Sequence, residues 1–513
     1  MSQKYPIGIQ SFEKLRIENF LYIDKTQYLN NIVNSAGYFF LSRPRRFGKS
    51  LFVNTIEALF QGKKELFKEL FIEDKWNWEQ KNPVIKISFS NIDHKELGLS
   101  IAIKKELRRL AESNGFELKS DSNGLMLREL IETIFKNQGQ VVLLIDEYDK
   151  PIIDYLGEST EKVLENQDIL KGFYSVLKDA DDYLRMVFIT GVSKFSRVSI
   201  FSDLNNLRDL TISKPFAGIC GITQVELKKN FAEELKLYDN DKIKSWYNGY
   251  SWDLSTKVYN PFSLLNFFND QGEFRNYWFV TGTPTFLINL SKDKKLVNFE
   301  NITISPTSLE AYRIDNIQLI PLMFQTGYLT IKDIDPETNI FTLDYPNQEV
   351  RSAFLENLAN NYVQGSEEEQ SVVLVLQISK ALKEGNLEKV QQIINTLFKS
   401  IPYTLWQKEN EPGGVPHFYH AIIHLTFKLL GIYVDSEVQT SDGRMDALVR
   451  LEKYVYCFEF KLDSSADKAL EQIETKGYLT PYLHQGKTCI GIGVNFSREE
   501  KKVKEFVWRE FLE

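Results

Sequence analysis

The chain has 513 residues, of which 43% are hydrophobic and 26% are charged, and its formal net charge is −8 at pH 7. This length exceeds what one hydrophobic core supports, so we expect about two to four globular domains. The negative charge excludes a protein coated with basic residues. It does not exclude nucleic-acid binding, because a local groove or a metal-bridged phosphate works inside an acidic protein.

The sequence carries no membrane or export signal. No apolar run approaches the roughly 18 residues of a transmembrane helix, and the N-terminal stretch MSQKYPIGIQSFEKL lacks the apolar segment of a signal peptide. Cys220, Cys457 and Cys489 are far apart and have no CxxC spacing, which argues against a disulfide framework or a zinc site. We therefore expect a cytoplasmic protein with no membrane contact.

Short apolar runs alternate with amphipathic stretches over roughly the first 215 residues. Apolar strands that alternate with helices predict a parallel sheet covered on both faces, which is an α/β fold. The predicted strands are residues 38–41, 84–89, 141–145, 186–190 and 210–212, and the predicted helices between them include 49–60 and 100–113.

The segment YFFLSRPRRFGKS reads as a strand, a loop and the start of a helix. Its end supplies the second half of a P-loop, in which backbone N–H groups and a lysine hold ATP phosphates and a hydroxyl holds Mg²⁺. The first half departs from that pattern, because Arg43 stands where a glycine is expected. The alternative is a basic surface loop. The candidate ATP-binding residues of this loop are Arg45, Arg46, Gly48, Lys49 and Ser50, with Ser50 also a candidate metal ligand.

A later apolar strand, VVLLIDE, ends in two acids. Asp146 would order Mg²⁺ through water, and Glu147 would polarise the water that attacks the γ-phosphate. The alternative is a buried strand whose terminal acids are only solvated. Thr190 ends the next predicted strand, and because parallel strands present their carboxyl ends at one sheet edge, we expect it near Asp146 as a γ-phosphate sensor. Together these motifs favour an ATPase.

Several segments then carry a specific resemblance. The chain resembles the AAA-ATPase-like family that is common in gut bacteria, whose members share the sequence RPRRFGKS, so Arg43 is a feature of the group. The resemblance implies an ATP-binding module with a lid. The segments that carry it are YPIGIQSFEKLRIENFLYIDKT, RPRRFGKS, LLIDEYDKP, TGVSKFSRVSIFSDLNNL, WYNGYSW and YNPFSLL.

Two acidic residues are expected to face each other near the C-terminus. If Glu452 and Lys453 form a two-residue turn, the flanking strands pair so that Asp446 lies opposite Glu459. Opposed Cβ atoms are about 5 Å apart, and like charges at that distance are destabilising unless a cation such as a divalent metal lies between them. Lys461 projects from the same face as Glu459.

This pattern, followed by a helix that carries Gln472, resembles the PD-(D/E)XK nuclease superfamily. By that resemblance Asp446 and Glu459 would bind Mg²⁺, Lys461 would activate water, and Gln472 would orient the site or the nucleic acid. One departure is that the preceding helix, PHFYH, has no acid in its first turn. The alternatives are a surface ion pair, or an intact nuclease fold without activity.

The whole chain is thus expected to hold three parts: a P-loop ATPase core at residues 1–221, a mostly helical lid or linking region at 222–400, and a small α/β restriction-endonuclease-like domain at 408–513. The leading hypothesis is an ATPase fused to a Mg²⁺-dependent nuclease that acts on DNA or RNA, with defence as an analogy and a homo-oligomer as a further hypothesis. The alternative is a nucleotide-dependent switch or scaffold that binds nucleic acid or protein without cutting.

Overall fold

The computed structural model describes residues 4–35, 37–194, 200–201, 204, 206–279, 285–294, 296, 298–310, 318–362, 371–399, 417–433, 435–441, 444–497, 499–500 and 502–512. Of residues 417–420, 432–433, 435–441 and 444–446 only the backbone is described. The contacts divide the chain into two compact units. The first comprises Met1–Leu287 and Phe299–Arg351, and the second comprises Ile288–Asn298 and Ser352–Glu513.

The first unit contains a five-stranded sheet in the order β2-β3-β4-β1-β5, and every neighbouring pair is parallel. Its middle strands are almost continuously apolar and buried, as a sheet covered on both faces requires. The predicted α/β class is confirmed. The strands are β1 (Gly37–Ser42), β2 (Val84–Ser88), β3 (Val141–Asp146), β4 (Leu184–Gly191) and β5 (Leu207–Asp209).

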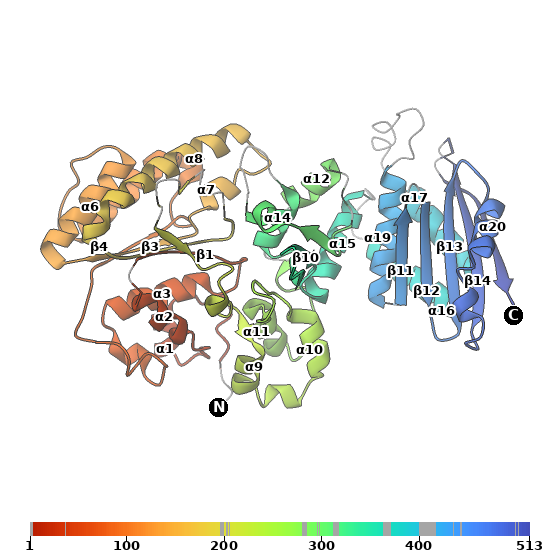
Figure 1. The fold of residues 1–513 in the computed structure, drawn as a ribbon, viewed down its shortest axis with the longest axis horizontal. Helices are drawn as coiled ribbons and strands as arrows, with labels where there is room; N and C mark the ends of the chain where they lie inside the picture. The colour runs from red at the N-terminus through yellow and green to blue at the C-terminus, as the bar shows by residue number, and fades with distance from the viewer. Residues whose placement is uncertain are drawn as a thin grey trace. The chain divides into compact units, whose positions relative to one another are not determined.

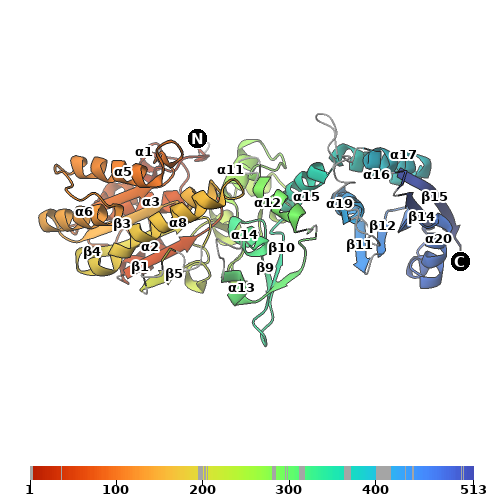
Figure 2. The same ribbon diagram turned by 90° about the horizontal axis from the view of Figure 1, so that it is seen from above.

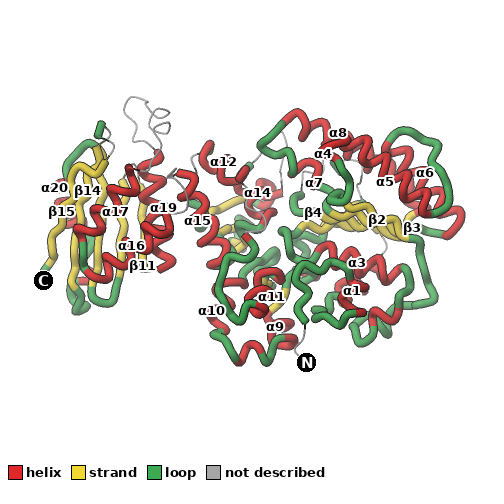
Figure 3. The backbone as a smooth tube through the Cα atoms, turned by 180° about the vertical axis from the view of Figure 1, so that it is seen from behind, coloured by secondary structure: helices red, strands yellow, loops and turns green. Residues whose placement is uncertain are grey.

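Helices cover both faces of this sheet. One face carries α1 and α3, and the other carries α6 and α8 (Figures 1 and 3). The helices of this part are α1 (Phe12–Ile17), α2 (Thr26–Val33), α3 (Lys49–Phe60), α4 (His94–Leu97), α5 (Leu99–Ser113), α6 (Asn123–Gln138), α7 (Lys150–Ile153) and α8 (Thr160–Ser175). The predicted helix at 49–60 coincides with α3.

The strand predicted at residues 210–212 is wrong. The strand there is β5, three residues earlier, and the chain turns immediately after Leu210, whose N–H still donates to Phe40 O at 2.9 Å. The turn is fixed by Asp209, whose carboxylate accepts the N–H of Thr211 at 2.8 Å. Thr211 therefore faces the end of β1, and its hydroxyl accepts the N–H of Ser42 at 3.1 Å.

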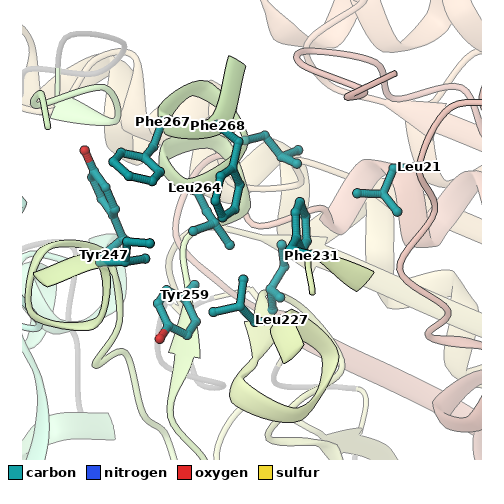
Figure 4. Packing of buried hydrophobic residues seen from close by; sticks show 11 residues of the cluster. Leu21, Leu227, Phe231, Tyr247, Tyr259, Leu264, Phe267 and Phe268 are labelled. Carbon is teal, nitrogen blue, oxygen red and sulfur yellow. The ribbon is translucent and has the colours of Figure 1, made fainter. Parts of the chain in front are cut away.

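The remainder of the first unit is built from short elements around an aromatic core. Phe231, Tyr247, Phe267 and Phe268 pack together with aliphatic neighbours in this core (Figure 4). The elements are β6 (Ile222–Thr223), α9 (Gln224–Asn230), α10 (Asn240–Tyr247), β7 (Val258–Tyr259), α11 (Pro261–Asn269), β8 (Ile302–Ile304), α13 (Pro306–Glu310), α14 (Leu319–Thr326), β9 (Thr330–Ile334) and β10 (Phe341–Asp344). The segment GYLTI thus spans the end of α14 and the start of β9.

The second unit has its own five-stranded sheet, in the order β11-β12-β13-β14-β15. Only β13 and β14 are parallel, and α20 connects them. The strands are β11 (Asp435–Ser441), β12 (Arg444–Arg450), β13 (Tyr454–Leu462), β14 (Thr488–Ser497) and β15 (Lys502–Phe511), and the helices are α16 (Ser371–Glu384), α17 (Leu387–Lys399), α19 (His417–Tyr433) and α20 (Ala466–Lys476). Helices α12 (Thr285–Asp293) and α15 (Gln348–Tyr362) contain two of the three divisions between the units, and the third lies between Asn298 and Phe299.

Alternate residues of β13 face different helices. Val455 and Cys457 pack with α20, whereas the ring of Phe458 contacts Phe427 of α19 and the Tyr456 hydroxyl donates to a carbonyl of α16. Figure 2 shows α20 on one side of this sheet and α16 and α17 on the other. By this alternation Glu459 lies on the α20 face.

Candidate functional site

The loop between β1 and α3 has the backbone form of an anion-binding loop. Gly48 has φ +94° and Arg46 has φ +68°, so both adopt the left-handed region before the helix begins at Lys49. Free N–H groups at the start of a helix of this length attract anions. The glycine is needed at position 48 because a side chain is strained at that φ.

Arg43, which replaces the expected glycine, is a structural residue of this loop. Its side chain is fully buried, and its guanidinium donates to the carbonyls of Ser42 at 2.9 Å, Thr211 at 2.8 Å and Phe216 at 3.3 Å. The same guanidinium lies 4.0 Å from the ring centre of Trp252. Burial lowers the pKa of Arg43 to about 10, which leaves it charged.

The ammonium group of Lys49 lies inside the loop. Its ammonium donates to the carbonyls of Arg43 and Pro44, each at 2.9 Å. Burial lowers the pKa of Lys49, and the nearby charges of Asp146 and Glu147 oppose that shift. A buried ammonium held only by carbonyls gains stability from an anion such as a phosphate.

Asp146 lies next to Ser50 at the end of β3. Burial raises the pKa of Asp146, while a hydrogen bond from the Ser50 side chain and the charge of Lys49 lower it. Among the residues that the structure describes, its Oδ1 atom is buried without a hydrogen-bond partner. The structure thus brings together the lysine, the hydroxyl and the acid of the predicted site. Glu147, with φ +52°, follows directly.

The end of β4 is tied to the turn after β3. Asp149 is 1% exposed, and its carboxylate accepts the N–H groups of Val192 at 3.0 Å and Ser193 at 2.6 Å. Tyr148 donates to Ser193 O at 3.0 Å. The Thr190 hydroxyl is buried, and no described atom pairs with it. Thr190 thus lies at the predicted sheet edge, on the strand between β1 and β3.

Several residues of this region, among them Lys49, Ser50 and Asp149, line a cavity of about 550 Å³. Its polar lining includes Arg45, Arg46, Gly48, Lys49, Ser50 and Glu147. Apolar side chains, among them Ile7, Ile222 and Leu265, line other parts of its wall. A cavity lined by both cationic and apolar side chains fits a nucleotide, whose phosphates are charged and whose base is flat and largely apolar.

The second candidate site lies on the α20 face of the second sheet. Backbone pairing places Asp446 opposite Glu459, which confirms the predicted register of the hairpin. Glu459 is fully buried, and Lys461 donates to its Oε1 at 2.6 Å and to Oε1 of Gln472 at 2.6 Å. Glu459, Lys461 and Gln472 are therefore in contact. The side chain of Asp446 lies outside the described part of the chain.

Two family models match the chain. One, described as "Predicted AAA-ATPase", matches residues 6–201, and the other, for the PD-(D/E)XK nuclease superfamily, matches residues 416–506. The chain is also 38% identical over 518 residues to an "Uncharacterized protein in vnfD 5'region" of Azotobacter chroococcum mcd 1, across 98% of each chain. The chain belongs to the AAA-ATPase-like family. Both resemblances seen in the motifs are thus confirmed.

The described residues of this AAA-ATPase-like chain leave out some polar side chains near the two candidate sites in the sequence. They are the side chains of His417, His420 and Glu437, and all of Arg197 and Glu411. Among the described side chains, no three His, Cys, Asp or Glu residues gather as metal ligands would. Within the same residues, no helix has the length and apolar character needed to cross a bilayer.

Some residues of the AAA-ATPase-like site were not predicted from the sequence. Asp149, Trp252 and Gln325 each contact a segment near the candidate site, and each belongs to a different stretch of chain. Two of them lie within the family motifs LLIDEYDKP and WYNGYSW. In the sequence, only the position within a family motif points to these two residues, because their partners are brought to them by tertiary contacts.

Proposed function

We propose that this chain binds and hydrolyses ATP in its first unit and carries a Mg²⁺-dependent nuclease site in its second unit that acts on DNA or RNA. The observation that carries the ATP assignment is the meeting of Lys49, Ser50 and Asp146 beside a cavity of about 550 Å³. The proposed parts remain a core at residues 1–221, a lid or linking region at 222–400 and a nuclease-like domain at 408–513. Three buried free cysteines accord with a cytoplasmic setting.

In the ATP site, Lys49 would exchange its two carbonyl partners for the β- and γ-phosphates, and the N–H groups around Gly48 would hold the same anions. Arg45 and Arg46 would approach the phosphates from the exposed side of the loop. Glu147 would orient the attacking water, and the Thr190 hydroxyl would contact the γ-phosphate.

A Mg²⁺ ion fits this site because the Ser50 hydroxyl and Asp146 are adjacent and one oxygen of Asp146 is buried with no described partner. Bound Mg²⁺ would neutralise charge on the β- and γ-phosphates. Ser50 would hold the ion directly and Asp146 through water. Burial raises the pKa of Asp146, so a cation in this place also favours the ionised carboxylate.

In the nuclease-like site, Asp446 and Glu459 would hold a divalent ion, because their strands place them opposite one another. Lys461 would position or deprotonate the attacking water, and Gln472 would fix the Lys461 ammonium, to which it is already hydrogen-bonded. Nucleic acid is the proposed substrate, with defence against foreign nucleic acid as its setting.

Replacement of Lys49 tests the ATP assignment. Lys49→Ala should lower Mg²⁺-dependent ATP turnover by roughly a hundredfold or more, since it removes the positive charge aimed at the transferred phosphate. Lys171→Ala, an exposed lysine of α8, is the matched control and should retain full turnover. Equal turnover in wild type and Lys49→Ala would place the ATP site elsewhere.

The nuclease assignment is tested with Asp446→Asn and Glu459→Gln, which keep the side-chain shape but weaken metal binding. Both should abolish Mg²⁺-dependent cutting of DNA or RNA, whereas Glu471→Gln on the exposed side of α20 should not. Cutting that survives both substitutions would show that the activity comes from another site or a contaminant.

A nucleotide-dependent switch that binds nucleic acid or protein without cutting it, or a scaffold, is the second candidate. It is favoured by the closed contact of Lys461 with both Glu459 and Gln472, and by the lack of an acid in the helix start PHFYH. Bound but uncut nucleic acid at saturating Mg²⁺ would support the switch.

A further inference from the structure

The C-terminal end of α14 contacts the loop that follows β4. Gln325 is 7% exposed, and its Oε1 accepts the N–H of Lys194 at 2.9 Å, while its Nε2 donates to Lys194 O at 3.4 Å. One side-chain amide therefore pairs with both polar groups of one peptide segment, as a neighbouring strand would. The other side of this loop is held by Asp149 through Val192 and Ser193.

Two residues later, α14 contacts the phosphate loop, which is the segment between β1 and α3 at residues 43–48. Gly327 ends the helix with φ +92°, and a Cβ built on it would lie 2.6 Å from Cγ of Pro44. That distance is far shorter than real carbon contacts, so the backbone at 327 and the Pro44 ring touch as closely as a glycine allows. Pro44 in turn supplies a carbonyl to Lys49.

Other residues between 250 and 278 hold the same stretch of the phosphate loop. Trp278 donates from its indole to Arg45 O at 3.0 Å, and Tyr250 packs edge-on against Phe47 with ring centres 4.8 Å apart. The ring of Trp252 lies against Arg43. The loop therefore has few independent degrees of freedom, and its position depends on the part of the unit that α14 belongs to.

We propose that Gln325 and Gly327 are positioning residues that make the phosphate loop and the loop after β4 move as one with α14. The proposal deepens the ATP assignment and rests on it for its role in turnover. Neither residue lines the cavity. Each acts through a loop whose other side carries residues of the site, namely Lys49 in one case and Asp149 in the other.

This arrangement gives α14 control over the rate of hydrolysis. A displacement of about 1 Å between a reacting group and its substrate is enough to cost orders of magnitude in rate. Because α14 holds both loops, a shift of this helix changes the distance between Lys49 and the residues at the end of β4. Conversely, phosphate binding at Lys49 changes the position of Lys194 through α14.

Amide hydrogen exchange on the full chain tests the coupling without nucleotide. The Cβ added in Gly327→Ala clashes with the Pro44 ring, touches Tyr250 at an ordinary distance of 3.5 Å, and has no atom of residues 192–194 among its nearest neighbours. The substitution should nevertheless accelerate exchange of the peptide with residues 192–194 at least about threefold, because the two loops share α14. The matched control is Gly115→Ala, which has φ +82° and no atom within 4 Å of the added Cβ. Unchanged exchange at 192–194 in a folded Gly327→Ala protein would overturn the proposal.

Gln325 provides a second test that does not depend on Gly327. Gln325→Met keeps the length of the side chain but removes both hydrogen bonds, whereas Gln325→Glu keeps the acceptor for Lys194 N–H. With Mg²⁺-ATP, Gln325→Met should lower kcat about tenfold at nearly constant KM, and Gln325→Glu should recover much of the loss. Equal kcat in wild type and Gln325→Met, or a change in KM alone, would contradict a positioning role.

The two proposals fail in different ways. If Mg²⁺-ATP fails to slow exchange around residues 48–51 of wild type, the ATP assignment is wrong, and the nucleotide-free exchange of Gly327→Ala and Gln325→Met still decides the coupling. If Mg²⁺-ATP protects residues 48–51 and neither substitution alters exchange at the loop it does not contact, the ATP assignment stands and the coupling is wrong.

Discussion

At the scale of single residues, Arg43 is the main departure from the P-loop pattern. Its role in the structure is that of a buried cation that holds the loop. Arg43 occupies the expected glycine position, and its buried guanidinium donates to three backbone carbonyls. Its backbone carbonyl still serves Lys49. The hydrogen bonds of the guanidinium thus fix the conformation of the loop, where a glycine would leave the backbone flexible. A fixed loop with arginine at this position is therefore compatible with phosphate binding.

Arg43 is therefore expected to dominate the stability of the loop. Arg43→Met should lower the free energy of unfolding by about 3 kcal/mol, because it removes three buried hydrogen bonds from a charged donor. Arg46→Met, which removes an exposed guanidinium 5.2 Å from the Phe262 ring, should cost less than about 1 kcal/mol. Urea denaturation of both variants measures the contrast, and equal losses would contradict the structural role of Arg43.

Asp149 predicts a pH dependence of stability with an unusual sign. Burial raises its pKa to about 6, so between pH of about 4 and 6 the folded chain holds a proton that the unfolded chain has lost. This contribution to stability is present below about pH 4 and is lost as pH rises through 6. Asp149→Asn should therefore become more stable relative to wild type as pH rises across that window, in urea titrations at each pH.

Asp154 provides the opposite case five residues away. Although burial acts to raise its pKa, hydrogen bonds from His94 and Lys150 hold it at about 2. Its contribution is present above about pH 4 and is lost as pH falls toward 2. Asp154→Asn should therefore lose stability relative to wild type at pH 5 but not near pH 2. If the stability of Asp149→Asn and of Asp154→Asn relative to wild type changed in the same direction as pH rises, the two opposite pKa shifts would be contradicted.

At this scale the sequence predicted candidate residues for the proposed chemistry, but it did not predict the contacts that hold them. Lys49, Ser50 and Asp146 follow from motif spacing, because strand ends and helix starts are local features. Asp149 and Gln325 do not, because their partners at residues 192–194 are reached only when β4 and α14 are placed in the fold.

At the scale of elements, buried strands were predictable and exposed or interrupted ones were not. The run that forms β3 is continuously apolar, and its predicted range differs from the structure by one residue. Strand β15 was missed because KVKEFVWREF carries charges on an edge strand and has several exposed positions. Residues 327–331, with the sequence GYLTI, are rich in strand-forming side chains, but Gly327 ends α14 and the strand begins only at Thr330.

The β12–β13 hairpin shows how local patterning fixes register. Leu451 N–H donates to Tyr454 O at 2.8 Å, which closes the turn around Glu452 and Lys453. Counting from that turn places Glu459 on the α20 face, where its carboxylate is fully buried beside Lys461. The register is therefore set by a two-residue turn that the sequence itself displays.

Loss of Lys461 should consequently destabilise the second unit. Lys461→Met leaves the buried Glu459 carboxylate without its ammonium, at a cost of about 3 kcal/mol in metal-free buffer. The double variant Glu459→Gln with Lys461→Met should recover most of that loss, because no charge is then buried. Chemical denaturation in EDTA measures both, and additive losses would show that the two side chains do not depend on one another.

At the scale of the whole molecule, the two compact units divide the proposed chemistry between them. Lys49, Ser50 and Asp146 all belong to the unit that ends at Arg351, and Asp446, Glu459 and Lys461 belong to the other. Composition and length indicated several domains. The division inside α12 and α15 depends on contacts between segments far apart in sequence, and sequence patterning does not display such contacts.

Nucleotide should therefore stabilise the chain through the first unit alone. At Mg²⁺-ATP concentrations about a hundredfold above Kd, binding contributes about 2.7 kcal/mol to the stability of the folded form. Scanning calorimetry should show an upward shift of one transition in wild type, no shift in Lys49→Ala, and a full shift in Glu459→Gln. An upward shift in Lys49→Ala equal to that of wild type would contradict binding at the phosphate loop.

The most direct test of the nucleotide site is anomalous scattering from crystals grown with Mn²⁺ and a non-hydrolysable ATP analogue. We predict a manganese peak beside Ser50 and Asp146, with the analogue's phosphates at Lys49, and a second peak between Asp446 and Glu459. Phosphate density bound elsewhere on the chain, with no manganese beside Ser50, would contradict the account.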